Sequence, residues 1–325
     1  MKRLILKFVA AAVAGAVVSA CGGSDDHDNA PAGTIVQVAE AGGLSYLLAA
    51  ATKAELADEL SAASAAGLTV FAPTNAAFNT LATQLGLADG PALVAALPKE
   101  ALASILSYHV LPAKKSAADL TSGGATQDTI YSFDGAVTKL NLTIANGGVI
   151  KDAVLTDAKV TTADVAATNG VVHIVDKVLV PPGVLNMVQM AQANPAAFSS
   201  LVGAVVSADL ATTLSSSTAK FTVFAPTNTA FAAAPTGLTT AQLRTVLTYH
   251  VLGSQVLSTA IPFGTPVATV AGQNITINAG TAPVIATITD TTATPATITA
   301  VDVRASNGVI HVIDKVLIPS LAGPG

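Results

Sequence analysis

The chain has little cysteine, few aromatic residues and no tryptophan. Among its 325 residues there is one cysteine, and 4% are Phe, Trp or Tyr. The shortage of aromatic rings disfavours a sugar-binding cleft built by ring stacking, although other modes of glycan binding stay open. With Cys21 as its single thiol, the chain cannot form an internal disulfide, so its folded part must be held by packing alone.

Charged residues are also scarce, and their balance is acidic. They make up 11% of the chain, with 15 basic and 20 acidic residues and a formal net charge of −5. An acidic chain does not attract the phosphates of nucleic acid or the headgroups of anionic lipid. We therefore expect no nucleic-acid partner and no electrostatic adsorption to a membrane.

Motifs of common catalytic and metal sites are absent. The sequence has no G-x-S-x-G nucleophile elbow, no H-E-x-x-H zinc spacing and no C-x-x-C redox pair. The glycine pairs at 123–124 and 147–148 lie in no phosphate-binding motif. We expect no catalytic residue, no metal and no cofactor.

The N-terminus has the pattern of a secretory signal. Lys2, Arg3 and Lys7 come before an apolar stretch, Phe8–Val18, and small residues then lead to Cys21. The apolar stretch is short for a transmembrane helix. Its ending resembles the lipobox of bacterial lipoproteins, in which the cysteine becomes the acylated N-terminus. The alternative is an ordinary signal peptide with an incidental cysteine.

These features predict a lipid anchor followed by a tether. We assign residues 1–20 to the signal peptide and residues 21–33, which are small, polar and acidic, to the lipidated Cys21 and a flexible tether. Residue 22 is Gly and not Asp. By resemblance to sorting rules of Gram-negative envelopes, this favours a secreted, membrane-anchored lipoprotein of the outer membrane, on its periplasmic or its surface face.

The remaining chain contains the same unit twice. Three blocks recur in the same order, at offsets of 153, 141 and 138 residues. Repeats this long indicate tandem globular domains, because solenoid repeats run about 20–50 residues. We expect domains at 34–182 and 183–320 and a tail at 321–325. The paired blocks are Thr69–Phe78 with Thr222–Phe231, Leu106–Pro112 with Leu247–Gly253, and Asn169–Pro182 with Asn307–Ser320.

Each repeat is expected to be an α+β domain. Helical spacing opens it, and Thr-Val-Phe-Ala-Pro predicts a strand that ends at proline and leads into a capped helix. A further helix, with Thr240 as the expected cap in the second repeat, should end in Tyr-His-Val-Leu, where Pro112 and Gly253 terminate it. The closing strands, Val171–Val175 and Val309–Ile313, are apolar except for one histidine and should be central. The first repeat has an extra segment around Leu87–Leu97.

Together the three blocks resemble the fasciclin domain. The resemblance covers residues 34–320 and rests on TVFAPTN-x-AF, the Tyr-His pair and NGV-[VI]-H-x-[VI]-D-K-V-L-[VI]-P. It implies two tandem fasciclin-like domains, each a β-wedge or sandwich of about seven strands with several helices packed at one side. Members of the family are extracellular or envelope-anchored modules associated with adhesion and matrix contacts, which implies a non-catalytic role.

The resemblance also implies candidate binding residues. In animal members the Tyr-His region and an Asp-Ile pair before the closing strand have been tied to integrin binding. In this chain valine replaces the isoleucine, and bacteria lack integrins, so the partner does not carry over. The matching positions are Tyr108, His109, Asp164, Val165, Tyr249, His250, Asp302 and Val303.

For all four domain histidines the residues favour a structural role over metal binding or catalysis. His173 and His311 lie on apolar strands, where an imidazole is expected to bond to the backbone. His109 and His250 are expected at helix ends, where they can bond to free carbonyls.

The leading hypothesis is a lipid-anchored cell-envelope protein that makes adhesive contacts. The membrane would hold the chain through Cys21, and the partner would be a cell-surface or envelope protein or a glycan. One alternative is an envelope module that binds a lipid, a glycan or a small apolar ligand between helices and sheet, since abundant Ala and Val can leave a cavity. A further hypothesis, an envelope hydrolase, is supported only by the presence of Ser, His and Asp in the sequence.

Overall fold

The computed structural model describes residues 33–62, 67–122, 126–134, 136–143 and 148–321. The expected signal peptide, Cys21 and the tether up to residue 32 lie outside these ranges, as do the last four residues. Over the described residues, no helix is both long enough and apolar enough to cross a membrane.

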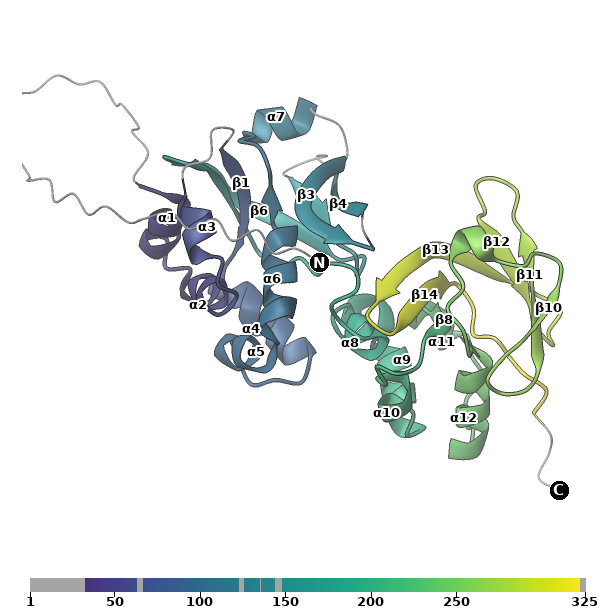
Figure 1. Ribbon diagram of the computed structural model, residues 1–325. Helices are drawn as coiled ribbons and strands as arrows, with labels where there is room; N and C mark the ends of the chain where they lie inside the picture. The colour runs from purple at the N-terminus through teal and green to yellow at the C-terminus, as the bar shows by residue number, and fades with distance from the viewer. Residues whose placement is uncertain (1–32, 63–66, 123–125, 135, 144–147, 322–325) are drawn as a thin grey trace, which may run out of the picture. The chain divides into compact units, whose positions relative to one another are not determined.

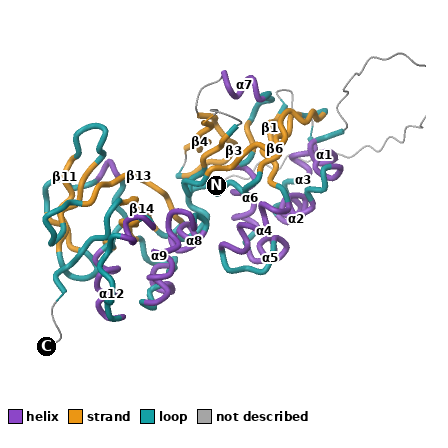
Figure 2. Tube along the Cα trace, turned by 180° about the vertical axis from the view of Figure 1, so that it is seen from behind, coloured by secondary structure: helices purple, strands orange, loops and turns teal. Residues whose placement is uncertain are grey.

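Each repeat contains a seven-stranded sheet of the same topology (Figures 1 and 2). The strand order is β2-β1-β7-β6-β5-β4-β3 in the first repeat and, read from the other edge, β9-β8-β14-β13-β12-β11-β10 in the second. The pairs β1–β7 and β8–β14 are parallel, and the other neighbouring strands are antiparallel. This confirms the expected α+β architecture. The strands are β1 Leu68–Pro73, β2 Val110–Leu111, β3 Thr126–Phe133, β4 Ala136–Thr143, β5 Val149–Lys151, β6 Asp157–Ala167, β7 Gly170–Val175, β8 Phe221–Pro226, β9 Val251–Leu252, β10 Pro266–Ala268, β11 Asn274–Ala279, β12 Ala286–Thr289, β13 Ala296–Ala305 and β14 Gly308–Ile313.

Most helices of a repeat gather at one side of its sheet. In the first repeat, α2, α4, α5 and α6 lie together, whereas α7 lies at the opposite end of the sheet (Figure 1). The helices are α1 Ile35–Ala41, α2 Ser45–Lys53, α3 Ala57–Ser61, α4 Asn75–Gln84, α5 Gly90–Ala96, α6 Lys99–Tyr108, α7 Ala117–Ser122, α8 Met187–Gln192, α9 Pro195–Ser207, α10 Ala211–Leu214, α11 Asn228–Ala232, α12 Thr240–Tyr249 and the 3₁₀ turn η1 Ser258–Ala260.

The repeated TVFAPTN block forms a strand, a turn and a helix, as predicted. In β1, Val70 and Ala72 point into the core under the helices, whereas Phe71 belongs to a second core on the other face. Alternation along the strand therefore buries both faces. The Thr74 hydroxyl accepts the N–H of Ala77 at 3.1 Å and caps α4. Thr227 caps α11 in the same way.

The closing strands are central and lie very close to their parallel neighbours. A Cβ on Gly170 would lie 2.2 Å from the carbonyl oxygen of Leu68, and one on Gly308 would lie 2.1 Å from that of Phe221. Glycine is therefore required at both positions for the strands to pair. Gly308 also has a φ of +152°, which disfavours any residue with a side chain.

Two details differ from the sequence expectations. Helices α6 and α12 end at Tyr108 and Tyr249, and the Val-Leu pairs that were expected to end them form the short strands β2 and β9. Thr239, and not Thr240, caps α12, because the Thr239 hydroxyl accepts the N–H of Gln242 and the Gln242 side chain bonds back to the cap. The extra segment around Leu87–Leu97 forms helix α5. Lys53 holds its end by donating to the carbonyls of Val94 and Ala95, both at 2.8 Å.

Candidate functional site

The Tyr-His pairs lie at the ends of α6 and α12, and their side chains are buried. The tyrosines are the last helical residues, and the histidines are the C-caps. The exposed fraction is 2% for Tyr108, 1% for His109, 1% for Tyr249 and 2% for His250. In this conformation none of the four side chains offers a surface to a partner.

Each histidine of these pairs bridges its helix to the segment after the closing strand. His109 Nδ1 lies 2.7 Å from the carbonyl oxygen of Ile105, and Nε2 accepts the N–H of Leu179 at 2.9 Å. In the second repeat His250 Nδ1 lies 2.8 Å from the Val246 oxygen, and Nε2 accepts the Leu317 N–H at 2.8 Å. Because Nε2 faces an N–H donor, the proton must be on Nδ1, and both rings are neutral.

Burial keeps these rings neutral. It lowers the pKa of His109 to about 4 and that of His250 to about 4, and the carbonyl that each ring donates to offsets only part of the effect. A proton on Nε2 would point at the backbone N–H that this atom now accepts. A neutral imidazole with both nitrogens engaged is a structural clamp and has no free nitrogen to act as a base.

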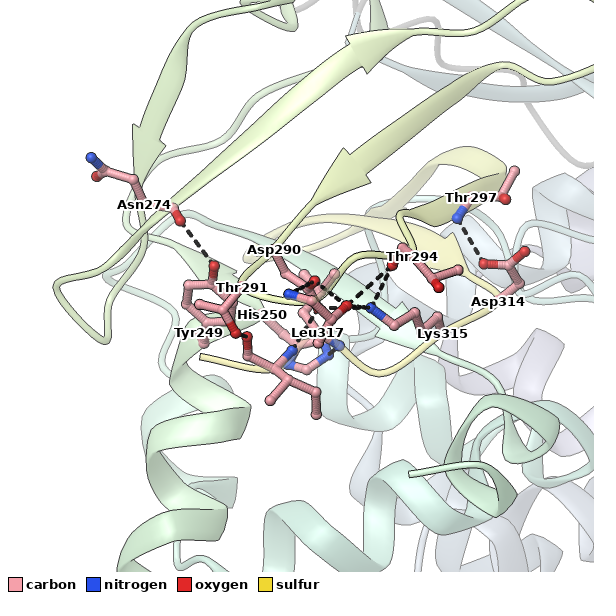
Figure 3. A network of polar contacts seen from close by, with 12 residues as sticks. Tyr249, His250, Asn274, Asp290, Thr291, Thr294, Thr297, Asp314, Lys315 and Leu317 are labelled. Atoms are coloured by element: carbon pink, nitrogen blue, oxygen red, sulfur yellow. Dashed lines mark hydrogen bonds and ion pairs between the residues drawn. The ribbon is translucent and has the colours of Figure 1, made fainter. Parts of the chain in front are cut away.

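The tyrosines of the two pairs pack differently. Tyr108 meets the ring of Tyr131 edge-on, with 6.1 Å between centroids. Burial raises the pKa of the Tyr108 hydroxyl, and the nearby carboxylate of Asp152 raises it further. The Tyr249 hydroxyl donates to the carbonyl of Asn274 at 2.9 Å (Figure 3). Both tyrosines are therefore part of the fold.

Asp164 and Asp302 each lie at a β-bulge, within a strand and not just before the closing strand. Their φ angles are +58° and +59°, and the pairing register of β6 with β7 and of β13 with β14 shifts beside them. Aspartate tolerates this left-handed conformation better than most residues, and a bulge can re-aim a side chain. Asp164 accepts the N–H of Ala117 at 2.8 Å, at the start of α7. Asp302 accepts both the N–H and the hydroxyl of Ser258, at the start of η1.

His173 and His311 stabilise these bulges from the closing strands. His173 Nδ1 accepts the N–H of Asp164 at 3.2 Å, and its Nε2 lies 3.1 Å from the carbonyl oxygen of Lys115. The ring stacks on Phe71 at 5.6 Å. His311 repeats the arrangement with Asp302, Val256 and Phe224. Both histidines bond to the backbone, as expected from the sequence.

The eight candidate binding residues therefore differ strongly in exposure. Asp164 is exposed, and Asp302 and Val165 are half-buried. Val303 is 7% exposed. With the buried Tyr-His pairs set aside, Asp164 is the most accessible of the eight candidate residues.

The second repeat contains a buried ion pair that the sequence reading did not identify (Figure 3). The Asp290 side chain is fully buried, and its carboxylate lies 2.9 Å from the Lys315 ammonium. Burial alone would raise the pKa of Asp290, but hydrogen bonds from Thr292, Ile318 and Lys315 outweigh it and lower the pKa. The pair joins the loop after β12 to the segment after β14.

The first repeat has the corresponding aspartate in a different setting. Asp152 is 5% exposed and accepts the N–H groups of Val154, Thr156 and Val180 at 2.9–3.2 Å. Burial raises its pKa to about 6, and these three N–H groups lower it only in part. Asp152 and Asp290 are separated by the same 138 residues as the closing blocks, which is the signal that could have identified them in the sequence.

The polar side chains of the repeated motifs have structural roles. Within the described residues, no buried side-chain nitrogen or oxygen lacks a hydrogen-bond partner. In the same part of the chain, no three His, Cys, Asp or Glu side chains come together as a possible metal site. The histidines and aspartates at the repeated motifs bond mainly to the backbone, so their role is to join elements of the fold.

Comparison with a protein-family model finds the fasciclin domain twice. The matches cover residues 42–181 and 196–319, which is most of the chain. The duplication inferred from the three blocks therefore corresponds to two copies of one domain.

Relatives with similar sequences occur in bacteria and in animals. Protein sll1483 of Synechocystis sp. is 39% identical over 42% of this chain and 75% of its own length. Transforming growth factor-beta-induced protein ig-h3 of Oryctolagus cuniculus is 32% identical over 78% of this chain, but the match spans only 35% of that protein. Human periostin is 32% identical over 48% of this chain and 18% of its own length.

Among solved structures, one match is the "FAS1 Domain Pair from the Insect Cell Adhesion Molecule Fasciclin I". It covers 87% of this chain and 98% of that chain, with 19% sequence identity and a TM-score of 0.41.

Proposed function

Because this chain belongs to the fasciclin domain family, we propose that it is a non-catalytic protein of a bacterial cell envelope that makes adhesive contacts through its two fasciclin domains. The lipidated Cys21 would anchor it in the outer membrane, and residues 22–33 would hold the domains away from the bilayer. The partner would be a cell-surface or envelope protein or a glycan.

The observation that carries this proposal is the use of the repeated polar residues. His109, His250, His173 and His311 all bond to backbone groups of their own repeat, and the same bonds occur in both copies. A catalytic site needs a base or nucleophile with a free reactive atom. In both repeats these histidines maintain the fold and leave no reactive atom free. This is compatible with a module that acts by binding.

Exposure favours one surface among the candidates. The Tyr-His side chains are buried, whereas Asp164 is exposed on the bulge that holds α7. We therefore place the adhesive contact of the first repeat at this bulge and not at its Tyr-His pair.

The proposal is tested by deleting the gene and measuring surface attachment, aggregation and biofilm formation. Loss of attachment that the wild-type gene restores is expected. Complementation with Cys21→Ser should not restore attachment, because the domains would be released from the membrane. Attachment that is unchanged in the deletion strain would contradict the proposal.

A further inference from the structure

The first repeat contains a cavity of about 370 Å³ between α7 and the sheet. This lies within the range of small-molecule sites, about 300–1,000 Å³. It is also more than twice the size of an apolar cavity of roughly 150 Å³ that can hold benzene. The described lining residues are Phe71, Ala117, Leu120, Thr121, Gly148, Val149, Ile150, Val160, Thr161, Ala163 and His173.

The described side chains that line the cavity are uncharged, and their hydrogen-bond donors are already used. It includes no Asp, Glu, Lys or Arg among the described residues. The Thr121 hydroxyl already donates to the carbonyl of Ala117, and the Thr161 hydroxyl to that of Ile174. His173 has both ring nitrogens engaged with the backbone. Among the described lining side chains, the hydroxyl and imidazole donors are already used, so a buried acceptor on a ligand would find no donor there. The lining therefore favours a hydrocarbon.

At the positions that correspond to two of the lining residues, the second repeat has larger side chains. At the 138-residue offset, Val301 replaces Ala163 and Ile298 replaces Val160. Ile298 is 1% exposed, and Val301 packs against the same apolar cluster. Because the two sheets have the same strand order, larger side chains at these positions would narrow the same space.

The cavity is accessible from solvent. Thr161 and Ala163, which line it from β6, are exposed. A flexible chain can enter past these residues without opening the core. The carboxylate or headgroup of a lipid would then stay in water outside the opening.

We propose that this cavity binds a single hydrocarbon chain, such as the acyl chain of a fatty acid or of a membrane lipid. This inference goes beyond the adhesive role, and the cavity adjoins the Asp164 bulge and α7, where the adhesive contact of the first repeat is proposed.

The test is fluorescence titration of the full chain carrying Cys21→Ser, which has no acyl group at that position, with cis-parinaric acid, followed by displacement with dodecanoic acid. One saturable site per chain is expected. The variant Val160→Ile/Ala163→Val introduces the residues of the second repeat and should weaken binding at least tenfold. Because the second repeat folds with these residues, thermal unfolding should show a folded protein.

Two controls locate the bound probe. Thr162 lies between the lining residues Thr161 and Ala163 of β6, and its side chain points to the other face of the sheet. The variant Thr162→Val should therefore leave binding unchanged. Phe263→Ala removes a side chain that is 45% exposed in the second repeat and should also have no effect. Absence of saturable binding, equal binding by the filled variant, or loss of binding in Phe263→Ala would overturn the proposal.

The source of the chain is distinguished by comparing envelope-extracted protein with Cys21→Ser. If the acyl group of Cys21 occupies the cavity, only the Cys21→Ser protein will bind the probe. If a free lipid is the ligand, both proteins will bind it. Either result supports a hydrocarbon site, whereas binding by neither overturns it.

Discussion

The imidazole of His109 accepts the backbone N–H of Leu179 at 2.9 Å, across 70 residues of sequence. The other ring nitrogen is bonded to the helix that ends at this histidine. One buried side chain thereby fixes the end of α6 against the segment after β7. His250 makes the same connection to Leu317 in the second repeat.

This bridge predicts a large loss of stability in His109→Asn. The shorter amide cannot reach the Leu179 N–H, and a buried donor without a partner costs about 1–3 kcal/mol. With the space left by the ring, we expect a loss of about 2–4 kcal/mol in the free energy of unfolding. Urea denaturation measures it, and amide exchange at Leu179 should accelerate. The exposed Lys114→Ala is the control, with an expected change under about 0.5 kcal/mol.

An unfolding free energy in His109→Asn equal to that of the wild type would contradict the bridge. His250→Asn should reproduce the loss in the second repeat, because its contacts are the same. A loss in one repeat only would show that the two histidines are not equivalent.

The same histidines predict a loss of stability on acidification. Their pKa in the folded chain is about 4, below the value of about 6.5 for an unfolded chain. Their contribution is therefore complete above about pH 6.5 and is lost as the pH falls toward 4. The size is about 3 kcal/mol for each ring, at about 1.4 kcal/mol per difference of 1 in pKa.

Urea denaturation at a series of pH values between 7.5 and 4.5 checks this. The wild-type chain should lose stability across the series, and the double variant His109→Asn/His250→Asn should lose much less. Parallel curves for the two proteins would mean that these rings do not cause the pH dependence.

Asp152 is expected to change the stability of the first repeat with pH in the opposite direction. Its folded pKa of about 6 lies above the unfolded value of about 3.9, so the fold favours the protonated acid. Its contribution is present below about pH 4 and is lost as the pH rises through 6. Asp152→Asn should remove this component, as seen in the difference between its pH–stability curve and that of the wild type. A difference that does not vary between pH 4 and 7 would contradict the assignment.

Asp290 should behave differently because Lys315 lies beside it. Asp290→Asn leaves the Lys315 ammonium, which is 26% exposed on its side chain, without its partner. We expect a loss of about 2 kcal/mol at pH 7, below the roughly 3–5 kcal/mol of a fully buried pair because water reaches the lysine. Lys315→Met is the matched variant, and urea denaturation of both measures the effect. A change under about 0.5 kcal/mol in both would show that the pair does not stabilise the fold.

The proposed acylation of Cys21 can be tested separately. Wild-type cells grown with a radiolabelled fatty acid should incorporate the label into this chain, whereas Cys21→Ser should not, because the thiol is the acyl acceptor. The protein should fractionate with membranes only in the wild type. Label in the Cys21→Ser protein would show that another residue is acylated. Absence of label from both proteins would contradict the prediction of a lipoprotein.

Local patterns predicted the main elements of the fold. The Thr-Val-Phe-Ala-Pro-Thr-Asn block predicted β1, its proline end and a cap of α4 by Thr74 or Asn75, all of which depend on neighbouring residues; the cap is Thr74. The expected end of α6, in Tyr-His-Val-Leu before Pro112, was too late, because the helix ends at Tyr108. The short strand β2 that follows was missed, because a pair of residues carries no readable periodicity.

The contacts between distant segments could not be predicted in this way. Asp152 bonds to Val180, and the Asn169 side chain bonds to Ile35 and Leu60. Such bonds depend on which loops the sheet topology brings together. The burial of Tyr108 likewise follows from the packing of β3 over α6 and is not visible in the motif.

The central claim is that folded fasciclin domains are sufficient for attachment. It is tested most directly by coating beads with the purified mature chain and counting beads that adhere to whole cell envelopes. The account predicts saturable adhesion that competes with soluble protein and is lost when the domains are unfolded. Adhesion no greater than that of uncoated beads would contradict it.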